Sequence, residues 1–164
     1  MTRFKLPLFL AFVVAITLLV AQPAVAAQSS QQIIIACLCQ IGCGCQSGTN
    51  GADTLSGGAG CDFICGKDGD DIISGGAGND TLSGDADIDT INGDADADTV
   101  NGGSGDDTLH GNTGTDTLRG GSEDDHLYGD SGDDSLDGGT ETDYLDGGTE
   151  TDTCINGETV INCP

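Results

Sequence analysis

The sequence predicts an all-β fold in which short strands stack on one another and Gly-rich turns connect them. The main observation is a nine-residue frame that runs without a gap through twelve copies, from residue 48 to residue 155. Position 1 of the frame is Gly in every copy, and position 8 is apolar or Cys in every copy. With 28 Gly, 4 Phe, 2 Tyr and no Trp, the chain lacks the bulky residues of an ordinary two-layer core.

Each column of the repeat has a physical reason. Glycine at position 1 permits tight turns and close backbone approach. Positions 7 to 9 are rich in Thr, Leu, Ile and Val, which suit a short strand. Alternation then directs position 8 to one face and its two neighbours to the other. We therefore expect a thin core of stacked position-8 side chains: Leu55, Ile64, Ile73, Leu82, Ile91, Val100, Leu109, Leu118, Leu127, Leu136, Leu145 and Cys154.

Position 6, where turn meets strand, is aspartate in all twelve copies and supplies the candidate metal ligands. Stacking would align these carboxylates along each edge, where they repel one another unless a cation lies between them. Ca²⁺ suits such a row because it takes 6–8 oxygen ligands and accepts the carbonyls that Gly-rich turns expose, whereas Mg²⁺ prefers a tight octahedron. The candidate ligands are Asp53, Asp62, Asp71, Asp80, Asp89, Asp98, Asp107, Asp116, Asp125, Asp134, Asp143 and Asp152.

The N-terminus indicates an exported protein, and the charge bears on its partners. Arg3 and Lys5 precede an apolar run over 6–21, and small residues at 24–26 offer a cleavage site, so 1–26 is predicted to be a signal peptide. An uncleaved membrane anchor is the alternative. We expect a secreted, extracellular protein with no membrane span after signal cleavage. With 28 acidic and 4 basic residues, the formal charge is −24, which argues against nucleic-acid binding.

Eight cysteines follow the predicted signal, and an even count in an exported chain favours disulfides. They are Cys37, Cys39, Cys43, Cys45, Cys61, Cys65, Cys154 and Cys163. The first four lie in a predicted N-terminal cap, 27–47, which could be stapled by disulfides or could hold a soft metal. Cys61 and Cys65 could pair with each other or with this cap. Cys154 and Cys163 both fall on position 8 if the frame continues, so we expect a bridge that closes a C-terminal cap, 156–164.

Copies such as Gly-Gly-Ala-Gly-Asn-Asp-Thr-Leu-Ser at 75–83 resemble the RTX, or hemolysin-type, calcium-binding repeat. The resemblance covers 48–155 and implies a right-handed parallel β-roll, a β-solenoid of about six turns with two repeats per turn. It also implies that each Ca²⁺ lies between stacked turns and takes position-6 carboxylates and turn carbonyls. The first sites would join Asp53 with Asp71 and, on the opposite edge, Asp62 with Asp80. Five gaps per edge allow up to about ten ions.

Position 4 departs from the glycine that this resemblance implies in five copies, which carry Asp87, Asp96, Glu123, Glu141 and Glu150. Glutamate adopts a left-handed turn conformation less readily than aspartate. The affected sites are expected to be distorted, weaker or supplied with an extra carboxylate. Both partners keep Gly at position 4 only in the pairs 53/71, 62/80 and 116/134, and we expect these sites to be the best formed.

The sequence thus predicts a secreted calcium-binding protein in which ion binding is coupled to folding. No enzyme is expected, because the paired carboxylates recur in every turn and both histidines, His110 and His126, lie at outward strand positions. Three roles stay open. The first is a structural role at the cell surface with a polysaccharide or protein partner. The second is an ice or polysaccharide binder that uses a Thr-lined sheet face, and the third is an accessory module of a secreted enzyme or toxin.

Overall fold

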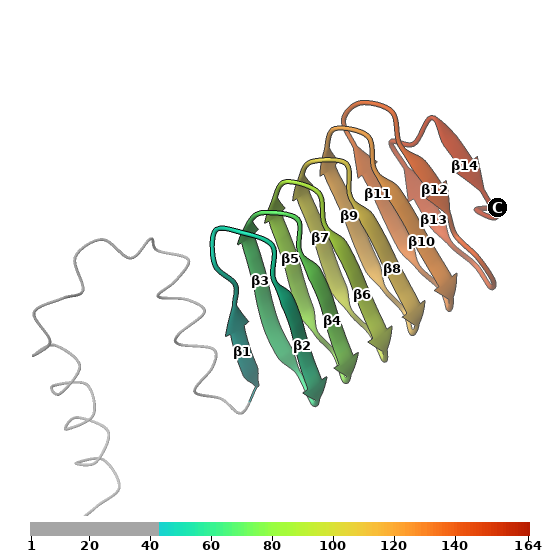
Figure 1. Ribbon diagram of the computed structural model, residues 1–164. Coiled ribbons are helices and arrows are strands. Elements are labelled where there is room, and N and C mark those ends of the chain that lie inside the picture. Colours follow the sequence, from blue (N-terminus) through green and yellow to red (C-terminus); the bar gives the residue numbers. More distant parts are fainter. Residues whose placement is uncertain (1–42) are drawn as a thin grey trace, which may run out of the picture. The chain divides into compact units, whose positions relative to one another are not determined.

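Two parallel β-sheets make up the computed structural model, which describes residues 43–164 (Figure 1). The predicted signal peptide, Cys37, Cys39 and most of the predicted N-terminal cap lie outside the described residues. The strands are β1 (Gly44–Ser47), β2 (Thr54–Ala59), β3 (Asp62–Asp68), β4 (Ile72–Ala77), β5 (Thr81–Ala86), β6 (Thr90–Ala95), β7 (Thr99–Ser104), β8 (Thr108–Thr113), β9 (Thr117–Ser122), β10 (His126–Ser131), β11 (Ser135–Gly139), β12 (Tyr144–Asp146), β13 (Thr153–Ile155) and β14 (Thr159–Ile161).

Strand pairing follows the nine-residue frame. The odd-numbered strands form one sheet in chain order and the even-numbered strands form the other, which we call the odd sheet and the even sheet. Neighbouring strands are parallel and two repeats apart, so that Thr81 lies opposite Thr99 and Leu82 lies opposite Val100. Each turn of the coil therefore contains two repeats, one strand in each sheet. This confirms the predicted parallel β-roll.

The core is a single stack of the predicted position-8 residues between the two sheets. Leu55 is 8 % exposed, the ten that follow it are at most 1 % exposed, and Cys154 packs partly buried at the end. Position-7 side chains such as Thr81 and Thr99 point to solvent. None of the described residues forms an apolar helix of membrane-spanning length.

The roll is longer than the twelve repeats alone would make it. They supply β2 to β13, which is the predicted six turns, but β1 and β14 extend the sheets to seven strands each. The nine-residue frame does not continue into the tail. Only three residues separate β13 from β14, so Thr159 lies opposite Tyr144, 15 residues earlier instead of 18, and Val160 lies opposite Leu145. The expectation that Cys163 occupies position 8 is therefore wrong.

Disulfides tie both ends of the described stack. Cys43, which precedes β1, bonds to Cys61, which precedes β3, and Cys154 in β13 bonds to Cys163 after β14. The predicted C-terminal bridge is confirmed, although the tail reaches it by a shorter turn than expected. Cys61 pairs with the cap and not with Cys65, which is the free cysteine among the described residues.

Candidate metal centre

The position-6 aspartates form a ladder along each edge of the roll. The backbone N–H of one aspartate donates to Oδ1 of the aspartate two repeats later, for example from Asp62 to Asp80 at 2.8 Å and from Asp98 to Asp116 at 2.8 Å. Eleven of the twelve, all except Asp53, are at most 7 % exposed. The stacked strands thus hold these carboxylates in two buried rows, one per edge, as the sequence predicts.

The second carboxylate oxygen of these eleven aspartates, Oδ2, is buried and has no hydrogen-bond partner. In nine of the eleven repeats, Oδ2 lies beside the position-1 glycine of its own repeat and the carbonyl oxygen of the position-1 glycine two repeats later; for Asp143 and Asp152 the carbonyl belongs to Asn156 and Asn162. A methyl group built on Gly111 would lie 2.6 Å from Asp116 Oδ2 and 2.8 Å from the Gly129 carbonyl oxygen. Two acceptor oxygens therefore converge where no donor is present, and an unpaired buried charge of this kind is costly.

Position-1 glycine is needed for this close approach and not for a left-handed backbone. No position-1 glycine has a positive φ, whereas positions 2 and 4 are left-handed in nearly every turn. Any side chain at position 1 would occupy the space in which the two oxygens converge. This explains from packing why the column is invariant along the chain.

Asp53, at the first turn, departs from the pattern. It is only partly buried, and its Oδ2 accepts hydrogen bonds from the backbone N–H and the hydroxyl of Thr49, at 2.6 and 2.9 Å. These bonds hold the pKa of Asp53 below its ordinary value. Of the three pairs expected to be best formed, 62/80 and 116/134 therefore carry two unpartnered Oδ2 atoms, and 53/71 carries one.

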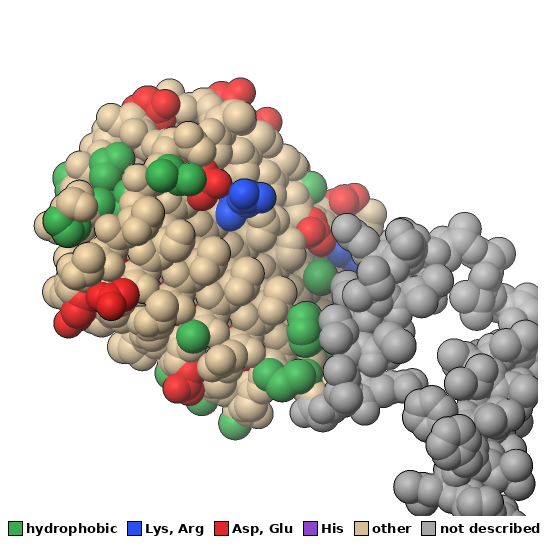
Figure 2. Space-filling model, turned by 180° about the vertical axis from the view of Figure 1, so that it is seen from behind, with side chains coloured by type: hydrophobic (Ala, Val, Ile, Leu, Met, Phe, Trp, Pro, Cys, Tyr) green, Lys and Arg blue, Asp and Glu red, His purple; other side chains and the backbone are tan. Residues whose placement is uncertain are grey.

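The acids at position 4 keep the turn path that glycine takes. All five have a left-handed backbone, with φ of 78° at Glu123 and 74° at Asp87. Their carboxylates can bond across turns: Glu123 accepts the Gly105 N–H at 2.6 Å, and Asp87 accepts the Gly69 N–H at 2.9 Å. On the face shown in Figure 2, acidic side chains gather mainly toward the margins, and backbone and uncharged side chains cover most of the surface.

Burial disfavours the charged form of the position-6 carboxylates. It raises the pKa of Asp98, Asp107 and Asp125 to about 7, and that of Asp89 and Asp134 to about 6. The backbone N–H bond to each carboxylate opposes this pKa shift, and neighbouring acids of the same row add to it. At these five positions, burial therefore favours a bound proton or a bound cation over a bare carboxylate.

The oxygens present fit a hard cation with mixed ligands. Within 43–164 no three His, Cys, Asp or Glu side chains converge on one point, so side chains alone do not build a metal cluster there. Paired carboxylates and turn carbonyls do converge, and Ca²⁺ accepts both kinds of oxygen. The position-6 residues Asp62 to Asp152 would hold such an ion, and it would neutralise the charge that burial makes costly.

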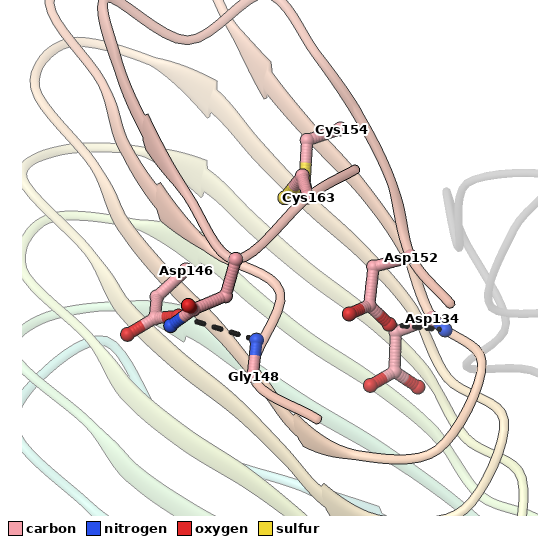
Figure 3. Close-up of a disulfide and its surroundings, with 7 residues drawn as sticks. Asp134, Asp146, Gly148, Asp152, Cys154 and Cys163 are labelled. Atoms are coloured by element: carbon pink, nitrogen blue, oxygen red, sulfur yellow. Dashed lines mark hydrogen bonds between the residues drawn. A yellow bond between two sulfur atoms is a disulfide. The ribbon is translucent and has the colours of Figure 1, made fainter. Parts of the chain in front are cut away.

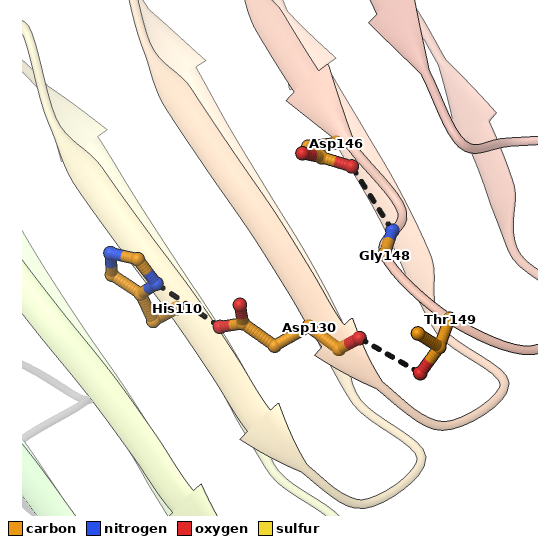
Figure 4. A network of polar contacts seen from close by, with 5 residues as sticks. All are labelled: His110, Asp130, Asp146, Gly148 and Thr149. Carbon is orange, nitrogen blue, oxygen red and sulfur yellow. Dashed lines mark hydrogen bonds and ion pairs between the residues drawn. The ribbon is translucent and has the colours of Figure 1, made fainter.

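The histidines lie away from these rows, on the outer face of the even sheet. His110 Nδ1 lies 3.1 Å from Asp130 Oδ2 (Figure 4). The His110 ring stacks on that of Tyr128, with centroids 4.6 Å apart. His126 is exposed and its ring is tilted against Tyr144 at 5.6 Å. Both histidines thus point outward, as expected, and neither contacts a position-6 carboxylate.

One acid of the site was missed from the sequence. Glu158 accepts the backbone N–H of Asp143 at 2.7 Å, the role that a position-6 aspartate has elsewhere. The signal that could have found it is local: an acid precedes a Thr-Val-Ile triplet that resembles positions 7 to 9. It was hidden because the nine-residue frame breaks three residues earlier.

Acidification should favour the folded roll when Ca²⁺ is absent. The pKa values of five position-6 aspartates, Asp89, Asp98, Asp107, Asp125 and Asp134, are raised on folding. The folded state therefore binds more protons than the unfolded chain, and the stability this adds is lost as pH rises through about 6 to 7. We expect the far-UV β-signal in EDTA to increase as pH falls from 8 to 5. A signal that decreases over this range would contradict the assignment.

Replacing Gly111 with alanine should destabilise the cation-loaded roll by about 1–3 kcal/mol, because the new methyl group overpacks the convergence of Asp116 Oδ2 and the Gly129 carbonyl. Gly51→Ala is the matched control, since nothing lies within 4 Å of its added carbon, and it should change stability by less than about 0.5 kcal/mol. Urea midpoints at saturating Ca²⁺ measure both. Equal midpoints for the two variants would refute the packing argument.

Comparison with known proteins places this architecture in a family. A search of curated proteins found no match to the chain. The family model for the RTX calcium-binding nonapeptide repeat, which spans four copies, matches residues 47–82, 74–109, 83–118, 110–145 and 119–154. These overlapping matches cover the repeats and about two thirds of the chain. The chain therefore belongs to the RTX calcium-binding nonapeptide-repeat family.

Proposed function

We propose that the protein is a secreted calcium-binding protein whose repeats fold when Ca²⁺ fills the two rows of turns. The observation that carries this proposal is the set of eleven buried, unpartnered Oδ2 atoms. Family membership supports calcium as the ion, since these repeats are calcium-binding modules. The proposed ligands are the twelve position-6 aspartates with carbonyls of the Gly-rich turns, up to about ten ions within the repeats.

Coupling between binding and folding follows from the charge. Each aspartate that enters the stack loses water and gains acidic neighbours, whereas 43–164 contains one lysine, Lys67, and one arginine, Arg119. Neither can neutralise two rows of carboxylates. A ligand that binds only the folded state adds its binding free energy to stability. Ca²⁺ would thus supply the stability that the one-residue-wide core lacks.

Export and an extracellular role are further parts of the proposal. Disulfides such as Cys43–Cys61 persist in oxidising compartments, which supports a location outside the cytosol. The predicted signal peptide at 1–26 would direct the chain there. We propose that the chain stays loose during export, folds where calcium is abundant and serves a structural or interaction role at the cell surface. The family module is structural, and we propose no enzymatic activity.

A second candidate role rests on one feature of the odd sheet. A file of exposed hydroxyls runs in register across its outer face, from Thr81 through Thr99, Thr117 and Ser135 to Thr153. Such a row of hydroxyls could contact ice or the hydroxyls of a polysaccharide. The neighbouring file contains Arg119, which donates to Asp137 at 3.3 Å and interrupts a uniform surface.

Calcium titration of the oxidised chain tests the main proposal. At pH 8 in EGTA the repeats should show little β-signal by far-UV circular dichroism, and excess Ca²⁺ should restore it, because only then are the buried carboxylates neutralised. Mg²⁺ at the same concentration should be far less effective. An equal β-signal in EGTA and in Ca²⁺ would reject the coupling of ion binding to folding.

A further inference from the structure

We propose that the C-terminal tail completes one more cation site of the calcium type, between the repeat that contains Asp143 and the tail, with Glu158 in the place of a position-6 aspartate. The proposal rests on the proposed function, because it takes the buried Oδ2 atoms to be calcium ligands. It concerns the edge of the roll whose row ends at Asp143. The family match ends at residue 154, so the repeat assignment does not include Glu158.

The register carries the first step. Thr159 pairs with Tyr144, and Glu158 precedes Thr159 just as Asp143 precedes Tyr144. Asp143 donates its N–H to Glu158 Oε2 at 2.7 Å, and Asp125 donates its own N–H to Asp143 Oδ1 at 2.9 Å. Glu158 therefore continues the row by one step, across a turn that is three residues shorter than those of the repeats.

The backbone holds Glu158 against the last aspartate of this row. The N–H groups of Glu158 and Thr159 both donate to the Asp143 carbonyl oxygen, at 3.1 and 3.0 Å. The position of the glutamate is thus fixed by three hydrogen bonds to one residue of the preceding turn. The Glu158 carboxylate is held where a position-6 carboxylate lies in the repeats.

An unpartnered buried oxygen marks the ligand position. Asp143 is 1 % exposed, and its Oδ2 has no hydrogen-bond partner. The carbonyl oxygen of Asn156 lies near Asp143 Oδ2: a methyl group built on Gly138 would contact both oxygens. In the repeats, the carbonyl oxygen near Oδ2 belongs to a position-1 glycine, as Gly129 shows for Asp116. Asp143, Asn156 and Glu158 thus repeat the oxygen types of an interior site.

The other edge shows what the tail does without such an acid. Asn162 places its carbonyl oxygen near Gly147 and Asp152 Oδ2, each 2.6 Å from a methyl group built on that glycine. The Cys154–Cys163 disulfide holds the tail over this end, with Asp134 and Asp152 stacked nearby (Figure 3). No tail acid bonds to the Asp152 N–H among the described hydrogen bonds, so we assign an added site to the Asp143 edge alone.

Counting bound ions tests the proposal. Native mass spectrometry at saturating Ca²⁺ should find one ion fewer in Glu158→Gln than in the unmodified mature chain. Hydrogen exchange should show that Ca²⁺ protects residues 155–164 in the unmodified chain and much less in the variant, with the repeats protected equally in both. Asp133→Asn is the matched control. Its carboxylate also accepts a backbone N–H across turns, from Thr151 at 3.0 Å, but Asp133 is exposed at position 5 and lies outside the position-6 rows, so its ion count should not change.

The outcomes separate this proposal from the proposed function. If Glu158→Gln keeps the full ion count and tail protection, the tail is only a cover, and the extra site is refuted while calcium binding by the repeats stands. If the unmodified chain binds no Ca²⁺, the proposed function fails and the extra site fails with it. If Asp133→Asn loses an ion as Glu158→Gln does, the effect is not specific to the row, and the extra site is refuted.

Discussion

Two rows of buried carboxylates, stacked turn on turn, set the constraint on which the rest of this structure depends. In ten of the eleven buried carboxylates, one oxygen joins successive turns by accepting a backbone N–H, as between Asp98 and Asp116. The other oxygen has no partner within the described residues. The carboxylates therefore link successive turns and also repel one another. A cation between turns would attract the carboxylates on both sides and so stabilise the fold.

The remaining features follow from this constraint. The core is one side chain wide, with Leu109 and Leu118 fully buried, so it offers little apolar area per turn. The turns exclude side chains at position 1, as Gly111 shows, because that space lies between oxygens. A repeat stack also needs closed ends, and the disulfides Cys43–Cys61 and Cys154–Cys163 join the terminal segments to it.

The repeats could be predicted from the sequence because each column has one physical cause that recurs twelve times. Strand positions, the core stack and the rows of aspartates all follow from the spacing. The two ends could not be predicted in this way, because their contacts do not follow the nine-residue frame. Asp53, in the first repeat, accepts hydrogen bonds from Thr49. The tail shortens its turn, so Glu158, and not a residue in the nine-residue frame, meets Asp143. Tolerance of a left-handed glutamate at position 4 was also underestimated, as Glu123 shows.

The most direct test is a crystal structure of the calcium-loaded mature chain, with anomalous scattering used to locate the ions. The account predicts anomalous peaks in rows along both edges, with each peak about 2.3–2.6 Å from a position-6 carboxylate oxygen and from turn carbonyls. It would be contradicted if the roll were folded as described while Oδ2 of residues such as Asp98 and Asp116 contacted only water or each other, with no peak between the turns.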